Sequence, residues 1–269
     1  MLLSLSRVGA TVLRQLYLLR ASPVRVLPLF AWAAIDIVLW GFITLYLDSI
    51  VISDLKLVST LLGAVLLWSF FGRVMHGVTT AFLEDVWSRN FLNLFASPLT
   101  IAEYISSLVI TSVLTSLVGL VVMLVLAALA FGLSFAVYGM MLLPFLLLLF
   151  LFGVALGVFA SAMVLRFGPA SEWFVWPMPA LLSPFVGVFY PLATLPNWMQ
   201  LVGYALPPSY VFEGMREIVL TGSFSTQALF YSAGLVLVYL LMACWCFVRV
   251  HRYAVNSGLI ARYSAESLS

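Results

Sequence analysis

Charged side chains are scarce in this 269-residue sequence: they make up 8% of it, against roughly a quarter of a soluble domain. Hydrophobic residues make up 64%. A water-soluble fold of this size could not bury so much apolar surface, so lipid must surround most of the chain. Lys56 is the only lysine, and no basic stripe is present. We therefore expect no nucleic-acid partner.

Motifs for catalysis and metal binding are also missing. No G-x-x-x-x-G-K-[ST] loop occurs, so the chain cannot itself hydrolyse ATP in the P-loop manner. His76 and His251 lack the H-E-x-x-H spacing of a zinc site. Cys244 and Cys246 are two residues apart, which places them on nearly opposite faces of a helix. We predict no catalytic residue, no metal site and no cofactor in this chain.

What the sequence does have is long apolar segments, each close to the roughly 20 residues that cross a hydrocarbon core. We predict an all-α membrane protein of one domain, residues 1–269, with six transmembrane helices. Their expected ranges are Val26–Leu47, Leu57–Phe82, Tyr104–Phe131, Tyr138–Leu165, Trp173–Tyr190 and Gln227–Val250.

The distribution of arginine predicts the orientation. An even number of crossings puts both termini on one side of the membrane, together with nearly all the cations. Only Lys56 and Arg216 fall on the other side. By the positive-inside rule we expect both termini to be cytoplasmic.

The first 25 residues predict an amphipathic helix that lies in the headgroup layer. Arg7, Thr11 and Arg14 share one stripe of this helix, and leucine and valine residues share another.

Residues 84–99, between the second and third crossings, predict a cytoplasmic helix with exposed aromatic side chains. Acidic residues suit its first turn, and a proline ends it. Such a helix suits a groove on a partner protein, although an interfacial helix that touches only lipid headgroups fits equally well. The candidate residues are Glu84, Asp85, Trp87, Arg89, Phe91, Leu94, Phe95 and Pro98.

Proline marks two further segments. Pro177, Pro179 and Pro184 should bend or partly unwind the fifth crossing, a feature that favours a helix lining a transport route over a merely kinked one.

Residues 191–226 are too apolar for a solvated loop and too interrupted to span, which predicts short external helices that re-enter the outer leaflet. A loop lying flat on the membrane is the alternative. The external candidates are Pro191, Pro196, Trp198, Pro207, Pro208, Tyr210, Glu213 and Arg216.

Ionisable residues inside the apolar segments are costly, so they should face the bundle or water. Asp36 lies in the middle of the first crossing, at about the depth of Arg73 in the second, and His76 is one turn further on. An Asp36–Arg73 pair is one hypothesis. The other is that Asp36 reaches a water-filled cavity while Arg73 extends to the headgroups.

The two loop segments, in this order between these crossings, resemble the ABC-2 type permease family over essentially the whole chain. Ser97-Pro98-Leu99 resembles the end of the family's coupling helix. Pro191…Leu195-Pro196-Asn197-Trp198…Pro207-Pro208-Ser209-Tyr210…Arg216 resembles its external signature. Arg89–Leu92 stands where drug-exporting members carry a G-T-L-E-like stretch, so the resemblance does not extend to a drug substrate.

The resemblance implies the permease subunit of an ATP-driven exporter. Two P-loop ATPase subunits, which bind ATP and Mg, would dock on residues 84–99. A second permease copy, identical or closely related, would complete the path through membrane lipid. Two other functions remain open: a membrane-embedded lipid-modifying enzyme that uses Asp36, His76, Glu213 and Glu217, and a structural subunit of a membrane complex.

Overall fold

The structure is a computed structural model that describes residues 4–21, 23–50, 58–88, 94, 97–132 and 139–259. Within these residues all the regular secondary structure is helical. The principal helices are α1 (Leu5–Ala21), α2 (Pro23–Ile50), α3 (Gly63–Trp87), α5 (Ile101–Phe131), α6 (Leu142–Phe167), α7 (Glu172–Val175), α8 (Met178–Leu182), α9 (Asn197–Tyr204), α10 (Pro207–Thr221) and α11 (Thr226–Asn256).

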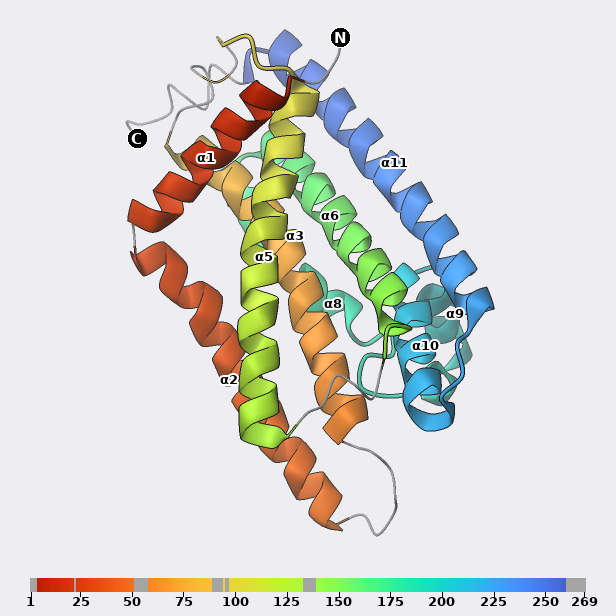
Figure 1. Cartoon of the computed structure of the whole chain (residues 1–269). Helices are drawn as coiled ribbons and strands as arrows, with labels where there is room; N and C mark the ends of the chain where they lie inside the picture. Colours follow the sequence, from red (N-terminus) through yellow and green to blue (C-terminus); the bar gives the residue numbers. More distant parts are fainter. Residues whose placement is uncertain are drawn as a thin grey trace.

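Two parallel helices, α3 and α6, form the centre of the bundle. On this pair, α5 packs against α3 and α11 packs against α6, while α2 lies along α5 (Figure 1). Helix α1 crosses one end of the bundle obliquely, and the last turns of α11 lie at the same end (Figure 1). We call this the α1 end. The opposite end carries α9 and α10, and we call it the α10 end.

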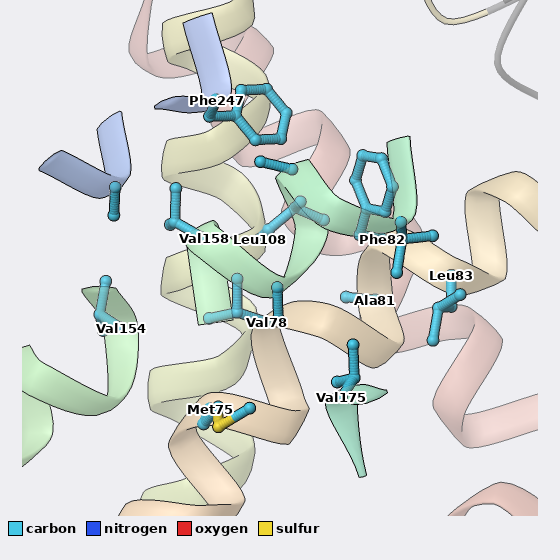
Figure 2. Packing of buried hydrophobic residues seen from close by; sticks show 14 of the residues in the cluster. Met75, Val78, Ala81, Phe82, Leu83, Leu108, Val154, Val158, Val175 and Phe247 are labelled. Atoms are coloured by element: carbon cyan, nitrogen blue, oxygen red, sulfur yellow. The ribbon is translucent and has the colours of Figure 1, made fainter. Parts of the chain in front are cut away.

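Glycine allows α3 and α6 to approach closely. A Cβ atom on Gly157 would lie 2.8 Å from the Met75 carbonyl oxygen, and one on Gly153 would lie 3.1 Å from Val74. Two glycines four residues apart on one helix face form a small-xxx-small pair, which permits this close approach. Valine side chains of both helices fill the adjoining core (Figure 2).

Small polar side chains join the central helices through hydrogen bonds to backbone carbonyls. The Ser112 hydroxyl of α5 donates to the Val74 carbonyl of α3 at 2.8 Å. The Thr79 hydroxyl of α3 donates to the Gly157 carbonyl of α6 at 3.3 Å. These bonds fix the register of α3 against both neighbours, because a hydroxyl in this environment has no water to satisfy it.

Four described helices are long and apolar enough to cross a membrane: Thr60–Trp87, Ile101–Phe131, Leu142–Phe167 and Thr226–Asn256. They match four of the six predicted crossings, with ends displaced by several residues. The first predicted crossing coincides with α2, which has 28 residues. The six-crossing count stays a prediction.

The fifth predicted crossing, Trp173–Tyr190, is not one continuous helix, and the predicted unwinding at its prolines is confirmed. Only α7 and α8 are helical, and turns follow from Ser183. The reason is the one that the sequence suggested: each proline removes a backbone donor from the segment. The broken chain still runs back from the α1 end toward the α10 end, with α8 about halfway (Figure 1).

The start predicted for the cytoplasmic helix at Glu84 is wrong. Glu84 and Asp85 belong to the last turns of α3, which continues to Trp87. Acidic residues are disfavoured at a helix C-terminus by the helix dipole. Here the Asp85 carboxylate instead has partners from two other helices, described below.

Candidate functional site

Three helices meet at the α1 end around the carboxylate of Asp85, whose side chain is 1% exposed. Arg14 of α1 forms an ion pair with it. The Tyr104 hydroxyl of α5 donates to the same carboxylate at 2.8 Å, and Gln15 is buried beside it. Burial of a carboxylate is tolerated only with such compensation. Asp85 is therefore a joint between α1, α3 and α5, not a contact for a partner protein.

A second carboxylate, Glu103, lies a short distance away at the start of α5. Its Oε2 atom accepts from the Thr100 amide at 2.8 Å, which completes a capping box. Its Oε1 atom accepts from the Ser4 amide at the start of α1 at 2.9 Å. Arg7 of α1 lies 3.6 Å from Glu103 and also donates to the Pro98 carbonyl. One carboxylate thus holds the beginnings of two helices.

Together these contacts fasten α1 across both ends of the 88–97 link between α3 and α5. Arg14 pairs with Asp85 in the last turn of α3, before the link, and Arg7 donates to the carbonyl of Pro98, the first residue after the link. The predicted amphipathic helix is present as α1. Arg7 and Arg14 of its polar stripe reach the buried acids, and Val8 and Val12 of its apolar stripe are buried as well. Leu5, Leu13 and Tyr17 are exposed.

The remaining predicted coupling residues differ in exposure. Trp87 is 50% exposed at the end of α3. Leu94 packs against the main hydrophobic core and so faces inward. Glu84 is half-buried on α3, and Pro98 is exposed. Arg89, Phe91 and Phe95 lie outside the described residues.

Replacing Glu103 with alanine should loosen the first turn of α1 and lower stability by about 2 kcal/mol, because two helix-start amides lose their acceptor. Hydrogen–deuterium exchange should accelerate for the α1 amides. Glu217→Ala is the control, since the Glu217 carboxylate accepts from the Ser223 hydroxyl on the exposed surface, away from α1. Unchanged exchange in α1 would contradict this role of Glu103.

A polar face runs along α3 deeper in the bundle. Ser69, Arg73 and His76 are spaced four and three residues apart, so they share one side of the helix. All three are only partly buried. This face lies between α2 on one flank and the broken α7–α8 segment on the other.

Both flanks contact the polar face directly. Asp36 of α2 accepts from the Ser69 hydroxyl at 3.4 Å and is attracted electrostatically by Arg73. The His76 ring packs on Trp176, with 4.8 Å between ring centroids. The Arg73 side chain also lies against Gly119 of α5. The structure thus gathers Asp36, Arg73 and His76 in one region, while their functional role stays a prediction.

The prolines of the broken segment have separate places. Pro179 is buried and lies near Gly72 of α3. Pro177 caps the start of α8, and the Pro184 carbonyl accepts from the Tyr190 hydroxyl at 2.8 Å. Trp40 of α2 stacks on Phe189 at 4.6 Å. The segment is therefore held against α2 and α3 along its length.

Glu213 and Arg216, two of the residues predicted to be external, act together as one structural clip. Arg216, 8% exposed, donates to the Gly187 carbonyl at 2.7 Å and to Glu213 at 3.1 Å. Glu213 in turn accepts from the Leu192 amide at 2.7 Å. Gly187 has a φ of +63°, which suits glycine. The clip holds α10 against the chain that follows α8.

The other residues predicted to be external organise α9 and α10, which are the short helices predicted within residues 191–226. That these two helices re-enter the outer leaflet stays a prediction. Pro196 precedes α9, and Pro207 and Pro208 are buried in the first turn of α10. The Tyr210 hydroxyl donates to the Tyr204 carbonyl at 3.0 Å. Trp198 is 62% exposed, and Pro191 is exposed.

Sequence reasoning missed the residues of α1 and α5 that hold the 88–97 link. One signal was available: Thr100-x-x-Glu103 before an apolar run is the pattern of a capping box. The pairing of Arg14 with Asp85 left no signal, because it joins residues 71 apart in the chain.

The bundle contains four described helices that are long and apolar enough to cross a membrane, and this indicates a multi-pass membrane protein. A comparison with protein families matches residues 22–220 to the ABC-2 type transporter family. The match covers most of the chain, and the chain belongs to this family of membrane transport components. A search of curated proteins finds no significant match.

Proposed function

We propose that the chain is the permease subunit of an ATP-driven ABC exporter in the bacterial inner membrane. Separate P-loop ATPase subunits, two per complex, would bind ATP and Mg and supply the energy. This chain would provide the substrate path and the coupling, and it would perform no hydrolysis itself. Family membership supports the transport role.

One observation carries the coupling role: the 88–97 link is anchored to three helices at once. The link follows α3 and precedes α5, and α1 is bonded to Asp85 in the last turn of α3 and to Pro98 three residues before α5. A force applied to the link by an ATPase would therefore reach the centre of the bundle. An unanchored loop would absorb the same force by bending.

The arrangement of arginine supports a cytoplasmic location for the α1 end. Arg7, Arg14 and Arg20 lie on α1, and Arg166 lies at the end of α6, where it stacks on Tyr253 of α11 at 3.8 Å. Arg216 lies at the α10 end. By the positive-inside rule, the α1 end with both termini faces the cytoplasm, where ATP is available.

The polar face of α3 is the proposed substrate path. It provides Asp36, Arg73 and His76 between α2 and a segment whose helix is interrupted, a feature suited to rearrangement. These residues are half-buried rather than enclosed. A second copy of the permease would close the open side, and a hydrophobic or amphipathic substrate could then pass along it.

The lipid-modifying enzyme is less well supported. Its candidate groups are dispersed: Asp36 and His76 lie within the bundle, Glu213 belongs to the α10 clip, and Glu217 bonds Ser223. Within the described residues, no three histidine, cysteine or acidic side chains gather where they could hold a metal ion.

Trp87 provides a direct test of the ATPase contact. The tagged chain, extracted from its native membranes in mild detergent, should bring down a P-loop ATPase in near-equal amount. Trp87→Asp should reduce that recovery about ten-fold or more, since loss of an aromatic anchor at an interface commonly costs at least 2 kcal/mol.

Trp198→Asp is the matched control, because Trp198 is also an exposed tryptophan but lies at the α10 end. It should leave ATPase recovery unchanged. Equal loss in both variants would indicate a general defect and contradict the assignment of the α1 end. Absence of any ATPase, with other membrane complexes preserved, would overturn the permease function and favour a structural subunit.

A further inference from the structure

An apolar groove of about 350 Å³ opens on the outside of the bundle between α5 and α11. Helix α6 forms its floor. The groove is lined by Ile105, Ser106, Val109 and Ile110 of α5, by Val154, Ala155 and Val158 of α6, and by Leu240, Ala243 and Cys244 of α11.

The groove exists because its walls carry small side chains where the neighbouring surface carries large ones. Ala155 and Ala243 line it, and Ser106 opens the α5 wall. On either side, Leu114 of α5 and Leu241 of α11 project outward and are 41% and 62% exposed. The surface is therefore hollowed between these projecting side chains.

The position of the groove identifies the surrounding medium. Val158 lies nine residues before Phe167, the end of α6, and so about 14 Å inside the bundle from the α1 end. Figure 2 shows Val154 and Val158 on α6 with Leu108 of α5 and Phe247 of α11 nearby. The three helices around this point, α5, α6 and α11, are all long and apolar enough to cross a membrane. At this depth the medium is the hydrocarbon of the lipid bilayer.

We propose that this groove is a binding site for one acyl chain of a membrane lipid. No charged residue lines it, so it selects a hydrocarbon rather than a headgroup. An empty apolar groove would forfeit dispersion contacts that a flexible chain can make with the branched side chains on three sides. A helix of a second copy, about 10–12 Å across with its side chains, is too wide to enter a groove of this volume.

The site differs from ordinary lipid contact because the chain is held on three sides. Along the exposed faces of α5 and α11, lipid touches the protein on one side only and exchanges freely. Within the groove a chain exchanges more slowly and occupies the site at low lipid concentration. Cys244, an exposed free thiol on its rim, is a native chemical marker of the position.

Photo-crosslinking tests the proposal. The purified protein is reconstituted into nanodiscs that contain a small fraction of phosphatidylcholine with a diazirine on one acyl chain, and the adducts are mapped to peptides after illumination. Labelling at Ser106 and Cys244 should saturate at a low fraction of the probe. Labelling at Leu114 and Leu241 should rise in proportion to the probe.

Ser106→Phe should fill the groove and reduce labelling of Cys244 about ten-fold, the change expected when a chain loses contact for as few as two methylene groups. Leu114→Phe, on the same helix outside the groove, is the matched control and should change nothing. Cys244→Phe fills the groove from the opposite wall, with labelling of Ser106 as the readout, and keeps the test available if Ser106→Phe does not fold.

Two results would overturn the proposal. In the first, labelling of the groove rises linearly with the probe and is insensitive to the filling variants, which indicates free exchange with the bilayer. In the second, the filling variants convert a dimer to a monomer in solution, which indicates that the groove belongs to an interface between copies. Neither result bears on the ATPase contact at Trp87, so the two proposals fail separately.

Discussion

Asp85→Ala is expected to lower the stability of the protein by about 3 kcal/mol, as is typical when one partner of a buried ion pair is removed. The change removes the negative charge that pairs with Arg14 and the carboxylate oxygen that accepts from the buried Tyr104 hydroxyl. We place the cost at the lower end of the usual range because the Arg14 side chain remains 28% exposed. Size-exclusion chromatography of the detergent-solubilised protein after stepwise heating measures the loss.

The series of variants around Asp85 separates charge from hydrogen bonding. Asp85→Asn retains an acceptor for Tyr104 and should cost less than Asp85→Ala. Arg20→Ala is the control, since Arg20 is exposed on the same helix as Arg14. The double variant Arg14→Met, Asp85→Leu should be less damaging than the two single changes added together. Strict additivity would show that the two residues do not form the joint.

Gly157→Ala is the second change with a large expected effect. The added Cβ atom would meet the Met75 carbonyl oxygen at 2.8 Å and Val78 Cβ at the same distance. Backbone cannot move aside as a flexible side chain can, so α6 must shift away from α3, at a cost of about 2–3 kcal/mol. Thermal stability in detergent and the yield of folded protein both report this loss.

Two other glycines make the comparison quantitative. Gly153→Ala meets its neighbours at 3.1–3.2 Å and should cost less than Gly157→Ala. Gly234→Ala on α11 meets nothing within 4 Å. It should stabilise the helix by a few tenths of a kcal/mol to about 1 kcal/mol, because alanine is the better helix former. Equal effects at all three positions would contradict close packing as the cause.

Much of the helical framework was predictable because local sequence determines it. Apolar length located α3, α5, α6 and α11, and α2 coincides with the expected first crossing. Pro177, Pro179 and Pro184 indicated the interruption of the fifth segment, since their effect on the backbone is local. Proline and amphipathic spacing likewise indicated α9 and α10.

The candidate site was less predictable because its contacts are distant in sequence. Glu84 and Asp85 were interpreted as the first turn of a new helix, on the general preference of acids for helix N-termini. Arg14 overrides that preference, since it supplies a partner for Asp85 from another helix. A sequence pattern shows where a charge lies along the chain, but not which charge it will meet in space.

The two acids of the α1 end have a practical consequence for the limits of the folding unit. The family match begins at residue 22, one residue beyond the end of α1. A protein shortened to that boundary would lose Arg7, Arg14 and the Ser4 amide, and would keep Asp85 and Glu103 as buried acids short of their partners. The region that a family comparison recognises is thus smaller than the region that must fold together, and trimming to the former would damage the latter.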